Sequence, residues 1–243
     1  MPKIFKGCDV TDSLELNNVE LLPTVTRTST YYPLPHYEFY TNAAKVLKDI
    51  GVGIVSNSFG LTPKRDRMFM WLETDAQVNG LPLCIGGRNS YDKSMSAGLC
   101  VGTKILVCSN KVLASYENGG VVSRKHTSAE NIDELSREFN ELLSTHASTK
   151  PDSFFDRFDG VRCMNISDRS VKETLVDLTL SNVIAPTDIR LIWEEFIAPK
   201  HPEFLDMGRA YQFLMAATEV FKLHKGADYQ IKAYDGVAKA LGL

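Results

Sequence analysis

The strongest constraint on the fold is a change in the period of the apolar residues about halfway along the chain. Between residues 52 and 108, apolar residues come in four short runs that are rich in β-branched and aromatic side chains. Turn-forming residues separate these runs, namely Gly60, Pro63, Asn79-Gly80 and Asp92. From Thr127 onward, apolar residues recur every three or four positions, which is the period of an amphipathic helix. The sequence therefore predicts an α+β fold, with a small antiparallel sheet flanked by helices and then a mainly helical C-terminal half.

The same patterns predict the individual elements. The expected strands are 52–59, 67–73, 81–88 and 99–108, and the nearly continuous apolar run 68–72 predicts a strand covered on both faces. The expected helices are 36–50, 128–146, 167–185, 187–197, 208–225 and 228–241. Phe154, Phe155 and Phe158 are interpreted as aromatic packing after a connecting segment. We expect residues 1–150 to form the β-rich half, with a helix before and after the sheet. Residues 151–243 should form a helical half packed on it, the two together making one compact domain.

The composition is that of a globular protein, because 44% of the residues are hydrophobic and 23% are charged. The longest apolar runs are far shorter than the roughly 20 residues of a membrane-spanning helix, and no signal peptide is visible. The five cysteines form no CxxC pair, which indicates reduced thiols in a cytoplasmic protein. The histidines lack metal-ligand spacing, and Gly51-Val-Gly53 and Gly86-Gly87 do not continue into phosphate-binding motifs. We therefore expect neither a metal nor a cofactor.

Charge is distributed unequally between the two parts of the chain. Residues 1–126 hold 14 Lys and Arg against 11 Asp and Glu, a net charge of +3. Residues 127–243 hold 13 against 19, a net charge of −6. The basic residues of the first part gather in three expected loops, at 62–67, 86–94 and 123–127. Such loops are ordinarily solvated turns, but their cations can also bind a polyanion.

The side chains in and near these loops are of the chemical types with which proteins contact nucleic acid. Arg and Lys neutralise phosphates, Asn and Ser donate hydrogen bonds, and Tyr91 offers a face on which a base can stack. The candidate nucleic-acid-binding residues are Lys64, Arg65, Arg67, Arg88, Asn89, Ser90, Tyr91, Lys93, Lys104, Arg124, Lys125 and His126.

Three blocks of the chain carry a resemblance to a known family. They are Asn89-Ser-Tyr-Asp-Lys-Ser-Met-Ser-Ala97, Gly102-Thr-Lys-Ile-Leu-Val-Cys-Ser-Asn110, and Arg124-Lys-His-Thr127 at the start of an expected helix. Together with Ala210–Thr218 and His224, they resemble the phage/plasmid-like protein family known as domain of unknown function 932. Tyr91 and Lys93 stand where that family more often has His and Gly. The resemblance implies a gene of a phage, prophage or conjugative plasmid, and hence the cytoplasm of a bacterial host, but it supplies no reaction.

Two function classes follow from these observations. The first is a protein that binds single-stranded DNA in recombination or replication, as a possible homo-oligomer, by analogy with Rad52-like annealing proteins. The alternative is a host-directed protein-binding module, an inhibitor or anti-defence factor that acts through the acidic surface of the helical half. One flank of the expected helix 128–146 carries the carboxylates of Glu130, Asp133, Glu134, Glu138 and Glu141. A hydrolase built on Asp92 and His126 is a third class, but no catalytic motif accompanies those residues, so the sequence favours a protein that is not an enzyme.

Overall fold

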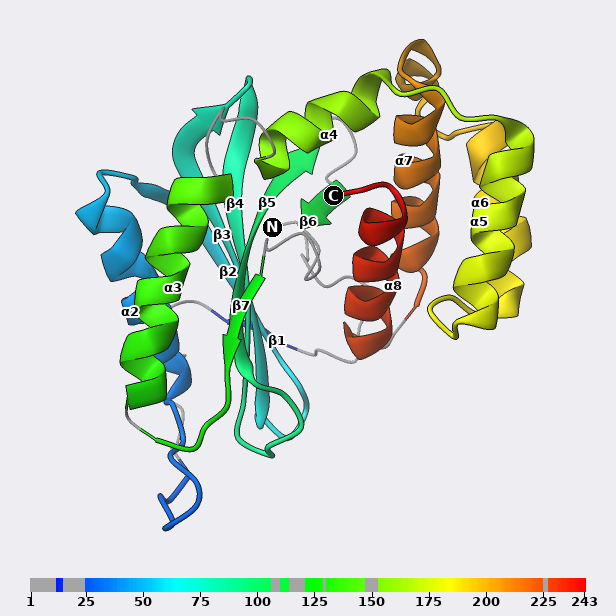
Figure 1. Ribbon diagram of the computed structural model, residues 1–243. Coiled ribbons are helices and arrows are strands. Elements are labelled where there is room, and N and C mark those ends of the chain that lie inside the picture. Colours follow the sequence, from blue (N-terminus) through cyan, green and yellow to red (C-terminus); the bar gives the residue numbers. More distant parts are fainter. Residues whose placement is uncertain are drawn as a thin grey trace.

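The centre of the molecule is an antiparallel β-sheet (Figure 1). The computed structural model describes residues 12–14, 25–105, 110–113, 121–128, 130–146, 153–224 and 227–243. Strands β1 to β6 follow one another across the sheet in chain order, and β7 also pairs with β5. The strands are β1 (Asp12–Leu14), β2 (Ile54–Leu61), β3 (Arg67–Val78), β4 (Leu81–Ser90), β5 (Ala97–Ile105), β6 (Asn110–Leu113) and β7 (Val121–Arg124). One edge of β5 is thus shared, with β7 along residues 97–100 and β6 along residues 102–105.

Helices lie on both sides of this sheet. Helices α2 (His36–Asp49) and α3 (Glu130–His146) lie side by side on one face, where α3 contacts β5 and β7. The C-terminal helices lie on the other side (Figure 1). They are α4 (Phe154–Cys163), α5 (Asp168–Leu180), α6 (Pro186–Ile197), the short 3-10 helix η1 (Pro202–Asp206), α7 (Arg209–Phe221) and α8 (Ala227–Ala240). The sheet followed by helices confirms the predicted α+β fold.

Side chains of alternate residues in the strands pack against α2. Met70 of β3 and Leu99 of β5 lie on this face, with Gly87 of β4 between them in the ladders. A Cβ atom on Gly87 would lie 2.6 Å from Met70 Cε and 3.0 Å from Phe39 Cε1. A side chain at residue 87 would therefore require Met70 and Phe39 to shift, so the glycine lets α2 approach the sheet closely.

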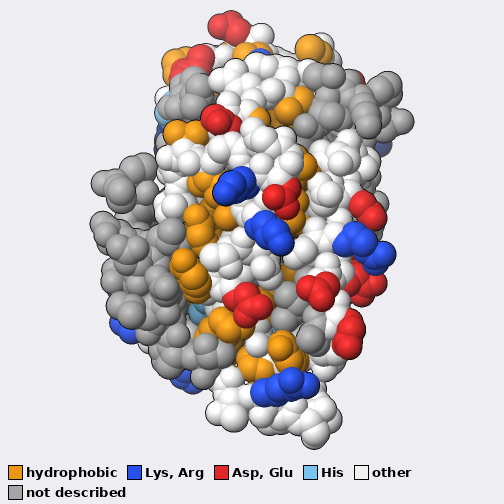
Figure 2. Space-filling model, turned by 90° about the vertical axis from the view of Figure 1, so that its left-hand side faces the viewer, with side chains coloured by type: hydrophobic (Ala, Val, Ile, Leu, Met, Phe, Trp, Pro, Cys, Tyr) orange, Lys and Arg blue, Asp and Glu red, His pale blue; other side chains and the backbone are white. Residues whose placement is uncertain are grey.

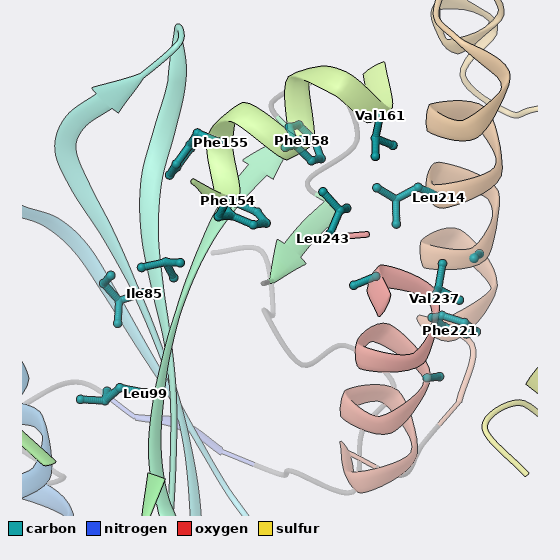
Figure 3. Packing of buried hydrophobic residues seen from close by; sticks show 14 of the residues in the cluster. Ile85, Leu99, Phe154, Phe155, Phe158, Val161, Leu214, Phe221, Val237 and Leu243 are labelled. Atoms are coloured by element: carbon teal, nitrogen blue, oxygen red, sulfur yellow. The ribbon is translucent and has the colours of Figure 1, made fainter. Parts of the chain in front are cut away.

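Helix α4 joins the sheet to the C-terminal helices, and the sequence did not predict it. Its N-cap is Ser153, whose hydroxyl accepts a hydrogen bond from the Asp156 amide at 3.1 Å. Phe154, Phe155 and Phe158 are fully buried and point from α4 into the space between the sheet and α7 (Figure 3). The predicted aromatic packing is present, but a helix carries it. The buried hydrophobic residues form one continuous cluster across both halves of the chain.

Replacing either of two glycines in the helical half by alanine should change the stability of the protein, but in opposite directions. A Cβ atom on Gly208 would lie 2.6–2.8 Å from backbone atoms of residues 162–164, which cannot move aside independently. Gly208→Ala should therefore destabilise the protein by about 1–3 kcal/mol. Gly160, in α4, has no atom within 4 Å of its Cβ position, so Gly160→Ala should stabilise it by about 0.5–1 kcal/mol. Urea unfolding of both variants checks this pair, and two effects of the same sign would contradict it.

None of the described helices is long and apolar enough to cross a membrane.

Candidate nucleic-acid interface

Three loops lie at the same end of the sheet, which we call the loop end. They are residues 62–66 between β2 and β3, 91–96 between β4 and β5, and 125–128 after β7. The strand registers bring them together, because Leu61 pairs with Met68, Met68 with Asn89, and Ala97 with Arg124. The first two loops are in direct contact, since the Tyr91 amide donates to the Asp66 carbonyl at 2.6 Å. In Figure 1 the loop end is the lower end of the sheet.

Four cations are exposed at the loop end, namely Lys64, Arg65, Lys93 and Lys125. No described carboxylate lies within ion-pair distance of any of them. Lys93 Nζ lies 4.7 Å from the ring centroid of Tyr31, a distance at which a cation and an aromatic ring attract each other. Arg65 and Lys93 both have positive φ angles, of 59° and 63°. The four cations come from all three loops and are available to an external anion.

Two other candidate arginines are engaged in ion pairs. Arg67 Nε lies 2.8 Å from Asp92 Oδ2. Burial disfavours the charge of Asp92, but hydrogen bonds from Ser94 and Arg67 outweigh it and lower its pKa to about 2. Arg124 Nε lies 3.1 Å from Glu134 Oε2, and its Nη2 pairs with Glu138. These two arginines tie loops to the rest of the fold and are already neutralised.

Arg88 and Lys104 lie within strands and not in the loops. Arg88 follows Gly87 in β4 and pairs with Gly98 near the loop end, but its half-buried side chain lies on the face of the sheet opposite α2. Lys104 pairs with Lys111 in the ladder between β5 and β6, toward the other end of β5. The structure therefore does not bring Lys104 to the loop end.

The polar candidates of the loops are buried. Asn89, Ser90, Tyr91 and His126 are each at most 8% exposed. The Ser90 hydroxyl accepts from the Met95 amide at 3.1 Å, which shapes the loop between β4 and β5. Tyr91 stacks on His36, with ring centroids 4.0 Å apart and an interplanar angle of 14°. The predicted stacking face of Tyr91 is thus covered, and these four residues support the loop end from within.

His36, which the sequence did not single out, lies at the centre of this support. It is the first residue of α2, directly after Pro35, and it is 1% exposed. Asn89 Nδ2 donates to His36 Nδ1 and to the Leu34 carbonyl, both at 2.9 Å. The Leu34 amide in turn donates to His126 Nδ1 at 3.4 Å. We call His36, Asn89 and His126 the histidine cluster. Its only sequence signal is a histidine at the start of a predicted helix.

Burial makes the charged forms of both imidazoles unfavourable. Desolvation lowers the pKa of His36 to about 4, against an opposing effect of the nearby Arg65 carbonyl. No well-oriented hydrogen bond joins that carbonyl to Nε2. Desolvation also lowers the pKa of His126. Both side chains are therefore neutral at pH 7.

Two further groups extend the loop end beside the third loop. Arg27 is exposed, and its Cζ lies 4.4 Å from the ring centroid of the half-buried Tyr32. The Tyr32 amide donates to the His126 carbonyl at 2.9 Å, which anchors this pair. Glu130, at the start of α3, lies close enough to Arg27 for the cation to help lower the pKa of the carboxyl, after hydrogen bonds from its own amide and Ser128. The aromatic side chain of Tyr32 remains partly exposed beside the third loop.

The acidic flank of α3 is partly occupied within the molecule. Of its five carboxylates, Glu134 and Glu138 hold Arg124, and Glu134 also pairs with Arg137. Figure 2 shows the side of the molecule that α2 and α3 cover. Acidic and basic side chains are interspersed on it, with hydrophobic ones visible between them, so no field of a single sign covers this side.

A second buried polar cluster lies in the helical half. The Asp188 carboxylate, 1% exposed, faces His224 Nε2 at 2.9 Å and accepts a hydrogen bond from the Tyr229 hydroxyl. That hydroxyl also accepts from the Ala185 amide at 2.8 Å. These bonds connect the start of α6, the residues after α7, and α8. Among the residues that the structure describes, no group of three His, Cys, Asp or Glu could hold a metal ion.

No family model, curated protein or solved structure matches this chain, so its resemblance to the phage/plasmid-like family stays a prediction.

Proposed function

We propose that the protein binds single-stranded nucleic acid at the loop end, in recombination or replication of a phage or plasmid. The observation that carries the proposal is the presence at the loop end of four exposed cations, Lys64, Arg65, Lys93 and Lys125, that lack carboxylate partners among the described residues. From β2 to β7 the loops span four strand spacings, roughly 19 Å. Cations distributed over loops of this span can face several consecutive phosphates.

The partly exposed Tyr32 supports a single strand over a duplex. Bases of a single strand are free to stack on an aromatic ring, whereas those of a duplex are already stacked. Arg27 beside the ring adds a planar cation that can contact a base or a phosphate. In this proposal the four cations neutralise phosphates and Tyr32 stacks on a base. The histidine cluster holds the loops in place.

The test is the salt dependence of binding, measured by fluorescence anisotropy with a labelled single-stranded oligonucleotide. Four phosphate contacts to a single strand predict a slope of about −3 for log K against log salt concentration. Affinity should then fall by about 50-fold between 50 and 200 mM salt. The double variant Lys64→Gln/Arg65→Asn should halve the slope, so that affinity falls only by about 7-fold over the same range. Asn is chosen at residue 65 because it tolerates a positive φ angle.

A matched control removes the same number of charges elsewhere. Arg169 and Arg190 lie on the helical half, and their side chains are 86% and 80% exposed. Arg169→Gln/Arg190→Gln should leave the slope unchanged. Absence of binding at 50 mM salt, or equal slopes for the two double variants, would refute the proposal.

A further inference from the structure

Residues 31–36 are hydrogen-bonded to two loops of the loop end, through Tyr91 and through His126 of the histidine cluster. We infer that His36 and His126 form a pH-operated latch, in which a proton on either imidazole releases residues 31–36 from the loops. The inference goes beyond the proposed function and does not depend on it, since it concerns contacts within the chain.

The hydrogen bonds define which imidazole nitrogen must stay unprotonated. Asn89 Nδ2 donates to the Leu34 carbonyl, so this side of the amide is the NH₂ group and its bond to His36 Nδ1 needs a bare nitrogen. The Leu34 amide can only donate, so His126 Nδ1 must also accept. Both rings are therefore held as the tautomer with its hydrogen on Nε2.

A second proton would go onto Nδ1 in each ring, because Nε2 already carries one. An imidazolium has two donors and no acceptor, so N–H groups would then face N–H groups at Asn89 and Leu34. Both sites are buried, and a buried donor without an acceptor costs about 1–3 kcal/mol. The facing N–H groups separate only when residues 31–36 move away from the loops, which also lets water reach the charged rings.

The groups that face the two rings compensate such a charge only in part, because desolvation outweighs the Arg65 carbonyl and Asp66. Around His36 are Tyr91, His126, the Arg65 carbonyl and Asp66, whose carboxylate already accepts from the Thr62 hydroxyl at 2.6 Å. Tyr31 lies beside His126, with ring centroids 5.9 Å apart, and its hydroxyl donates to the Tyr91 carbonyl. Nε2 of both histidines makes no well-oriented hydrogen bond to the described residues, although the Arg65 carbonyl lies near His36. The charged forms are thus poorly solvated where they lie.

The direction of the pH dependence follows from the lowered pKa values of the two imidazoles. The closed form is fully stable above the ordinary histidine pKa of 6.5 and loses stability as the pH falls toward about 4. His36 alone makes the opening constant about 20-fold larger at pH 5 than at pH 7. His126 acts in the same direction and increases the ratio further.

Amide hydrogen exchange measured by NMR tests the latch directly. The reporters are the amides of Tyr32, Leu34 and His36, which donate to the His126 carbonyl, His126 Nδ1 and the Tyr91 hydroxyl. Their protection factors, corrected for the intrinsic effect of pH, should fall by 20-fold or more from pH 7 to pH 5. Amides of buried residues in α7, such as Phe213, should keep their protection. An unchanged protection of the reporters, or an equal fall in α7, would overturn the inference.

Variants separate the latch from other titrating groups. In His36→Gln/His126→Gln, which keeps hydrogen-bonding side chains but cannot titrate, the pH dependence of the reporters should disappear. The control His201→Gln removes a partly exposed histidine of the helical half and should leave it intact. Should the double variant not fold, NMR titration of the wild-type imidazoles still decides. If both titrate near 6.5 while the reporters stay protected, the latch does not exist.

Discussion

Replacing Phe158 by alanine should lower the free energy of unfolding by about 3–5 kcal/mol. Phe158 is fully buried at the junction of α4 and α7. Its ring centroid lies 5.9 Å from that of Phe154 and 6.0 Å from that of Tyr211. Because these neighbours belong to different elements, they cannot all move to fill the cavity. Alanine is the better helix former, but only by up to about 0.7 kcal/mol, which does not offset the loss.

Urea unfolding followed by circular dichroism measures this effect. The matched control is Leu180→Ala at the end of α5, where the side chain is 76% exposed, and its change should stay within about 0.5 kcal/mol. A loss below 1 kcal/mol for Phe158→Ala would show that α4 does not connect the sheet with the helical half as described.

Tyr229→Phe is the second large effect, with an expected loss of about 2–4 kcal/mol. The variant removes one hydroxyl that makes two hydrogen bonds. Asp188 loses a donor to its buried carboxylate, and the Ala185 amide loses its acceptor. Bonds to a charged group contribute about 1.5–3 kcal/mol, and a buried amide without a partner costs about 1–3 kcal/mol.

The same substitution at Tyr37 is the control for this experiment. Tyr37 is half-buried, and its hydroxyl has no hydrogen-bond partner among the described residues. Tyr37→Phe should change the free energy of unfolding by less than about 0.5 kcal/mol. Equal effects in the two variants would mean that the Asp188 cluster contributes nothing to stability.

The periodicity of apolar residues predicted most of the fold because it reports directly on burial. The strand expected at 81–88 is β4 (Leu81–Ser90), and the helix expected at 187–197 is α6 (Pro186–Ile197). The apolar run 68–72 is buried throughout, as a strand covered on both faces requires. Prediction failed where aromatic residues were crowded together or where the strand was very short. The three phenylalanines of α4 cluster too closely to show a helical period, and β6 and β7 have only four residues each.

The candidate site was predictable only in part, because a sequence shows which groups are present and not which are buried. Lys64, Arg65, Lys93 and Lys125 lie on loops and are exposed. Asn89 and Tyr91 belong to the same polar stretch as Lys93, yet their side chains are buried. The alternation of side chains along β4 carries Asn89 to the face of the sheet that packs on α2. His36 and Asn89 are 53 positions apart in the chain, and Leu34, which binds His126, is 92 positions from it, so no local pattern could indicate the histidine cluster.

The shared edge of β5 has a consequence for self-association. An uncovered strand edge presents a row of free amides and carbonyls, onto which another molecule can add a strand and start an aggregate. Here β7 and β6 together occupy β5 at residues 97–100 and 102–105. Only Val101 lies between the two ladders, and one residue is too short a template for an incoming strand. On this side the sheet therefore ends in two strands of four residues each, and strands this short are poor templates for edge-to-edge aggregation.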